Sequence, residues 1–104
     1  MALTRDFKQT VVSRVQRDPK FAKALLDEAA GLMLSGEPET ARLVLRDLVN
    51  ATIGFEALAS ETHKPAKSLH RMLSAHGNPS MDSLSAIFSA VQQKIGTKVR
   101  VVHV

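Results

Sequence analysis

Apolar residues recur every three or four positions along most of this chain, and turn-forming residues interrupt them at intervals. This spacing gathers the apolar side chains on one face of an α-helix. The pattern predicts six helices, over residues 3–16, 18–35, 38–50, 53–62, 65–74 and 80–96. Most begin at a Pro or a capping residue, and Gly36 supplies a left-handed stop after the second. We therefore expect an all-α fold.

Individual residues add expectations about how these helices begin and pack. Asp18 and Thr52 are each placed to cap a helix through a side-chain oxygen, and Ser80 or its neighbour is placed to cap the sixth helix. Gly31, inside the second helix, predicts close packing against a neighbouring helix, with a kink as the alternative. The third helix is expected to turn three charged side chains outward: Arg42, Arg46 and Asp47. The first two helices are expected to bury four large side chains against the third and sixth: Phe7, Phe21, Leu25 and Leu32.

The last seven residues abandon the helical pattern. Lys98 to Val104 contains four Val, which alternate with polar residues at its start and are typical of a β-strand. A lone strand in a helical chain needs a partner, so we expect it to pair with its copy in a second subunit or with another protein. A frayed terminus is the alternative.

Composition excludes several classes of protein. A chain of 104 residues with 44% apolar residues can bury one core. The absence of Cys excludes disulfides, thiolate catalysis and Cys-based metal sites. Four Phe are the only aromatic residues, which argues against a stacking platform for single strands. The charged start and the lack of a long apolar run predict no secretory signal, no membrane span and a cytoplasmic location.

Basic charge is concentrated in the second part of the chain. Residues 1–61 hold 8 Lys and Arg against 9 Asp and Glu, whereas residues 62–104 hold 6 against a single acid, Asp82. Such a distribution is typical either of a solvated basic face or of a surface that binds a polyanion. The position of the charges within a motif must decide between them.

The predicted fourth and fifth helices have the pattern of a helix-turn-helix. Ala59 is a small residue at the point where the second helix of such a pair crosses the first. Four apolar residues point toward the core: Leu58, Leu69, Met72 and Leu73. The outward face of the fifth helix then carries Ala66, Lys67, Ser68, His70 and Arg71. These residue types suit a DNA major groove, where Lys and Arg donate to guanine and Ala contacts a thymine methyl.

Three stretches carry a resemblance to a known family: Ile53 to Thr62, Pro65 to Ser74 and Gly77 to Leu84, with Leu69 to Pro79 the most specific part. They resemble the Cro/repressor-type helix-turn-helix regulators of the addiction-module antidote (HigA-like antitoxin) family, over at least residues 38–96. The resemblance implies a lambda-repressor-like DNA-binding domain, a homodimer that binds an operator and represses its own operon, and a small ribonuclease toxin encoded beside it.

Two positions of the predicted turn differ from the usual motif. His63 stands where Gly is common, and His tolerates left-handed backbone better than most residues. Lys64 stands where an apolar residue is usual, and its side chain is expected to extend toward a DNA phosphate. After the fifth helix, Ser74, His76 and Asn78 are candidates for phosphate contacts, with turn formation as an equal alternative.

The sequence therefore predicts an N-terminal helical extension packed on the core (1–37), a helix-turn-helix DNA-binding core (38–96) and a C-terminal strand at a dimer contact (97–104). The expected function is sequence-specific binding of double-stranded DNA by an autorepressing, antitoxin-like regulator. The alternative is a toxin-neutralising interaction module with little DNA binding. His63, His70 and His76 lack the spacing of a metal or catalytic site, so we expect no cofactor, metal or enzymatic activity.

Overall fold

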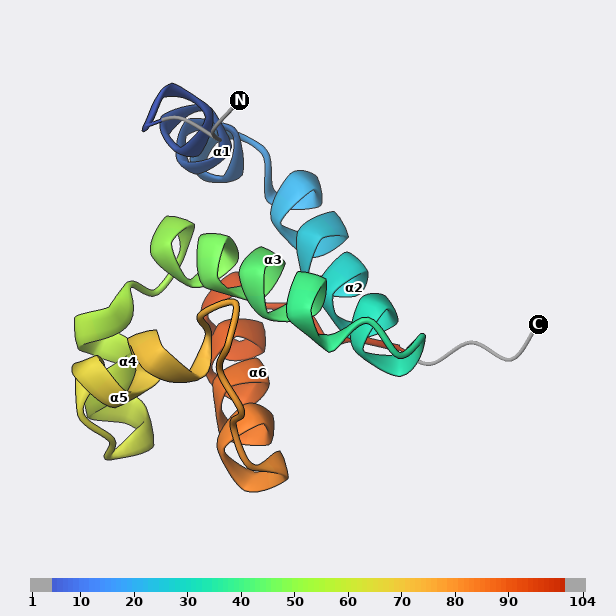
Figure 1. The fold of residues 1–104 in the computed structure, drawn as a ribbon. Helices are drawn as coiled ribbons and strands as arrows, with labels where there is room; N and C mark the ends of the chain where they lie inside the picture. The colour runs from blue at the N-terminus through green and yellow to red at the C-terminus, as the bar shows by residue number, and fades with distance from the viewer. Residues whose placement is uncertain (1–4, 101–104) are drawn as a thin grey trace.

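The computed structural model describes residues 5–100, with side chains from residue 9 onward, and this range contains helices and no strand. The six helices are α1 (Arg5–Arg17), α2 (Pro19–Leu34), α3 (Pro38–Ala51), α4 (Phe55–Thr62), α5 (Ala66–Met72) and α6 (Met81–Ile95). Figure 1 shows α3 in the middle of the molecule, with α4 and α5 to one side and α2 to the other. The expected all-α class is confirmed.

Two of the three expected caps are confirmed. The Asp18 carboxylate accepts a hydrogen bond from the Lys20 N–H at 3.0 Å, and Ser80 Oγ accepts one from the Ser83 N–H at 3.1 Å. The Thr52 cap is wrong, because its hydroxyl donates to the Leu48 carbonyl at 2.7 Å, and α4 starts only after Gly54. The Thr52 hydroxyl bonds back to the last turn of α3, so it belongs to the end of α3 and does not cap α4.

One hydrophobic core runs through all six helices. Val15 of α1 and Ala22 of α2 belong to the same buried cluster as Ile87 and Val91 of α6. The largest fully buried side chains come from α2 to α6 and the residue after α5: Leu26, Leu45, Leu48, Val49, Leu58, Leu69, Leu73, Ile87 and Val91. Residues 5–37 and 38–96 therefore share one core.

The N-terminal pair of helices packs on this core with partly buried side chains. Phe21 and Leu25 of α2 lie against the core cluster, and the Arg14 guanidinium sits 4.8 Å from the centre of the Phe21 ring. Leu32 is half-buried, and the side chain of Phe7 lies outside the described residues. α2 packs mainly on α3 and also contacts α6.

Two expectations about packing are wrong. Gly31 is exposed, and a Cβ added there would have no atom within 4 Å, so no helix packs closely against it. The side chain of Arg42 does not simply face outward. It is half-buried and donates hydrogen bonds to the Ser74 and Ala75 carbonyls, because α3 lies against the turn that follows α5.

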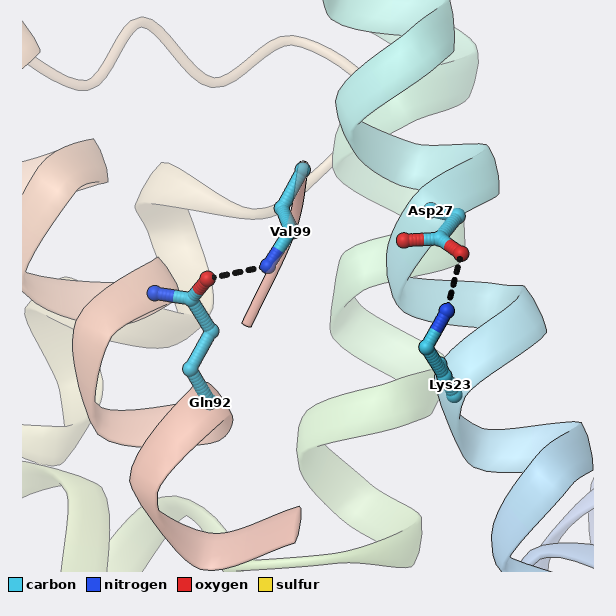
Figure 2. Close-up of polar contacts among 4 residues, drawn as sticks. All are labelled: Lys23, Asp27, Gln92 and Val99. Carbon is cyan, nitrogen blue, oxygen red and sulfur yellow. Dashed lines mark hydrogen bonds and ion pairs between the residues drawn. The ribbon is translucent and has the colours of Figure 1, made fainter. Parts of the chain in front are cut away.

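The predicted C-terminal strand falls partly outside the described residues. Residues 97–100 are not a strand, and residues 101–104 are not described. The chain turns at Gly96, and the Val99 N–H donates to Gln92 Oε1 at 2.6 Å (Figure 2). Residues 97–100 lack a neighbouring strand in the described chain, so this backbone N–H bonds a side chain of α6 instead.

Candidate nucleic-acid interface

The connection between α4 and α5 is a tight turn built around His63. This residue has φ 58° and ψ 37°. Among the described residues it is the only non-glycine residue with positive φ. This is the left-handed conformation, which His tolerates better than most residues. The Lys64 N–H donates to the Ala59 carbonyl at 3.2 Å, which closes the C-terminus of α4. The side chain of Lys64 is half-buried at the entrance to α5.

The inner face of α5 is anchored in the core. Leu69 on α5 and Leu73 just after it have no exposed surface, and Leu58 of α4 is equally buried. Ala59 and Met72 lie partly buried against the same cluster. The inward-facing residues expected from the sequence are therefore confirmed, and α5 has a fixed rotation about its own axis.

The outer face of α5 exposes basic side chains. Lys67, His70 and Arg71 are exposed, whereas Ala66 and Ser68 are half-buried beside them. Lys67 and Arg71 are four residues apart, which places them one turn from each other on one helix face.

These two cations have no acidic partner in the part of the chain that the structure describes. The ion pair found there joins Lys23 and Asp27 of α2 at 3.3 Å (Figure 2). Lys67 and Arg71 therefore present their positive charge to solvent, where an anion can meet it.

His70 is exposed but not free to rotate. Its ring stacks on the Phe55 ring of α4, with 3.8 Å between the centroids and 19° between the planes. Phe55 is itself buried at the start of α4. The stack joins α5 to a core residue of α4, and the exposed imidazole can still make an external contact.

Arg42 of α3 fixes the turn that follows α5. Its Nε donates to the Ser74 carbonyl at 3.0 Å, and a terminal guanidinium nitrogen donates to the Ala75 carbonyl at 2.7 Å. The Gly77 N–H also donates to the Ser74 carbonyl, at 3.1 Å. Sequence reasoning missed this role, because the two acceptors lie 32 and 33 residues away and nothing local indicates them.

The three candidate residues of this turn differ in what they can offer a ligand. Ser74 Oγ donates to the Arg71 carbonyl at 2.8 Å, so its proton is used within the turn and only its lone pairs remain. His76 and Asn78 are exposed. Gly77 lies so close to the end of α5 that an added Cβ would collide with the carbonyl oxygens of Arg71 and Met72.

The candidate residues thus form one continuous stretch. Lys64 precedes α5, Lys67 and Arg71 lie on its outer face, and His76 and Asn78 follow it. Within the described residues, no group of three or more His, Cys, Asp and Glu side chains is arranged to hold a metal ion. None of the helices in that range is both long enough and apolar enough to cross a membrane.

None of the protein-family models, curated proteins or solved structures compared with this chain matches it.

Proposed function

We propose that this protein is a sequence-specific, double-stranded-DNA-binding transcription regulator of the helix-turn-helix type, acting as an autorepressing, antitoxin-like protein. The observation that carries the proposal concerns Lys67 and Arg71, which have no acidic partner among the described residues. Both lie on the exposed face of a short helix, and the opposite face of that helix is fixed in the core. A basic face on a helix that is fixed in position is what a major groove accepts.

The residues on and around α5 are proposed to contact two parts of the duplex, the base edges and the phosphates. Lys and Arg reach the acceptors of guanine in the major groove, so Lys67 and Arg71 are the proposed base readers. Lys64 before the helix, with His76 and Asn78 after it, would contact phosphates on either side. Phosphate contacts fix the position of the helix along the duplex, while base contacts supply the sequence preference.

Rigidity of the flanking turns supports this assignment. The Phe55–His70 stack holds α5 against α4, and Arg42 holds the turn after α5 against α3. A recognition helix that is already fixed in position loses less conformational entropy when it binds. The aromatic stack and the hydrogen bonds of Arg42 therefore favour a preformed binding surface.

The proposed partners are an operator duplex and a second copy of the chain. A single helix of this length contacts too few base pairs for useful specificity, so two copies are expected to present two helices to successive major grooves. The resemblance to addiction-module antidotes adds a third proposed partner, a small ribonuclease toxin.

Binding to duplex DNA from the region upstream of the protein's own gene tests the proposal. Fluorescence anisotropy at several salt concentrations should show tight binding that weakens as salt rises, because bound cations release counterions from the phosphates. A scrambled duplex of equal length should bind more weakly. Lys67→Ala and Arg71→Ala should each cost about 1–3 kcal/mol of binding free energy if the side chain reads a base.

Lys20→Ala and Lys94→Ala provide matched controls, since both remove an exposed cation from another helix. Their affinities should stay close to that of the unsubstituted protein. Equal losses from all four variants would indicate non-specific attraction to a polyanion. Absence of duplex binding at low salt would overturn the proposal in favour of a protein-interaction module.

A further inference from the structure

A small cavity lies where α2, α3 and α6 meet the turn that follows α5. Its volume is about 130 Å³. Ala41 and Leu45 of α3 are buried in its lining, whereas Pro38 and Asn78 are exposed, so the cavity has an apolar interior and opens to solvent beside these two residues. The other lining residues are half-buried: Met33, Arg42, Pro79, Leu84 and Phe88.

Arg42 brings a positive charge to this apolar lining. It is the one charged side chain among the described residues that line the cavity. Its Nε and Nη2 atoms donate to the Ser74 and Ala75 carbonyls at 3.0 Å and 2.7 Å. These bonds use two of the five N–H groups of a guanidinium, so three remain for another acceptor.

The charge of Arg42 is not balanced by a carboxylate. Within the part of the chain that the structure describes, no acidic side chain forms an ion pair with Arg42. The two carbonyls that it bonds are neutral. No side-chain nitrogen in this range is buried without a hydrogen-bond partner, so Nη1 reaches solvent. A half-buried cation with free N–H groups beside an apolar cavity is suited to an acid, because a carboxylate accepts two parallel bonds from a guanidinium.

The size of the cavity limits the apolar part of such an acid. A protein cavity of about 150 Å³ lined by apolar side chains binds benzene. A volume of about 130 Å³ therefore suits a single ring or a short branched chain, and a larger body would extend into solvent.

We propose that this cavity is a binding site for a small monocarboxylic acid. The carboxylate bonds the free N–H groups of Arg42, and one ring-sized apolar group lies against Leu45, Leu84 and Phe88. Burial of the apolar group supplies affinity, and the guanidinium offsets the cost of moving the carboxylate away from water. The proposal needs no DNA, so its test is separate from that of the proposed function.

Titration of the full chain with sodium benzoate, followed by NMR without DNA at constant pH and ionic strength, tests this site. Benzoate should saturate the protein with a dissociation constant of about 1 mM or tighter. The shifted amides should be those of the cavity lining, such as Ala41, Leu84 and Phe88. Benzyl alcohol has the ring without the charge, and acetate has the charge without the ring. Each should bind about 10-fold more weakly than benzoate.

Arg42→Met should lower the affinity for benzoate about 10-fold or more, because it removes the donors of the carboxylate. Its affinity for benzyl alcohol should change by less than about twofold, since both residues are apolar along their stems. A variant that merely distorts the cavity would weaken both probes. Arg46→Met is the matched control, because Arg46 is half-buried on the same helix but does not line the cavity. It should bind benzoate as the unsubstituted protein does.

Circular dichroism must show native helix content for each variant. If Arg42→Met unfolds, Ala41→Val replaces it: this variant adds apolar volume to the lining and should weaken benzoate and benzyl alcohol alike. The site is refuted if benzoate does not saturate the protein, if acetate or inorganic phosphate binds equally well, or if a folded Arg42→Met variant keeps the full affinity. Benzoate binding by a protein that binds no duplex DNA would instead overturn only the proposed function.

Discussion

Gly31 and Gly77 show how the surroundings of a glycine decide the effect of replacing it. Gly31 lies in α2 with open space where a Cβ would go, so Gly31→Ala should stabilise the protein by about 0.5–1 kcal/mol through the higher helix propensity of Ala. Gly77 lies against the carbonyls that end α5, so Gly77→Ala should destabilise it by about 1–3 kcal/mol. Urea denaturation measures both, and changes of equal sign would contradict this account of the two sites.

Residues with local partners were predictable from the sequence, and residues with distant partners were not. Asp18 and Ser80 bond backbone groups two or three residues away, so their capping followed from sequence order alone. Arg42 bonds carbonyls more than 30 residues away, and His70 stacks on a ring in another helix. Gly31 was misjudged because the prediction rested on its residue type alone, although Glu28 and Asp27, three and four residues before it, place it on the polar face of α2.

At the scale of elements, apolar contacts hold the inner face of α5, and the hydrogen bonds of Arg42 hold the turn that follows its C-terminus. Removing the guanidinium in Arg42→Met should cost about 1–3 kcal/mol of unfolding free energy, because it leaves the Ser74 and Ala75 carbonyls without these charged donors. The Gly77 amide, which bonds the Ser74 carbonyl, should then exchange its hydrogen faster.

Arg46→Met is the matched control for this prediction. Arg46 is also half-buried on α3, but its side chain makes no hydrogen bond within the described residues, so its replacement should change the unfolding free energy by less than about 0.5 kcal/mol. Faster exchange at Gly77 in both variants would show that the turn responds to the loss of a charge on α3, with no special role for the Arg42 contacts.

The periodic spacing of apolar residues predicted the number and order of the helices, since each helix needs only its own sequence to reveal an apolar face. The exposure of Leu34 on α2 and Met81 on α6 was not predictable in this way. Both fall within apolar patterns that look like core positions, and only the packing of the helices leaves them exposed. Periodicity identifies an apolar face but not the partner that covers it.

At the scale of the whole molecule, the continuous core predicts that α2 and α5 unfold together. Leu26 of α2 is fully buried in the cluster that also contains Leu45 of α3 and Leu73 after α5. Leu26→Ala should therefore lower the unfolding free energy by about 2–5 kcal/mol, the range for a cavity left by a buried leucine. In a two-state molecule this loss should appear equally in the most protected amides of α2 and α5, measured by native-state hydrogen exchange. Leu25→Ala at a half-buried neighbouring position should give a smaller but equally shared loss. Unchanged protection of α5 in the Leu26→Ala variant would mean that the N-terminal helices unfold as a separate unit, contrary to the shared core.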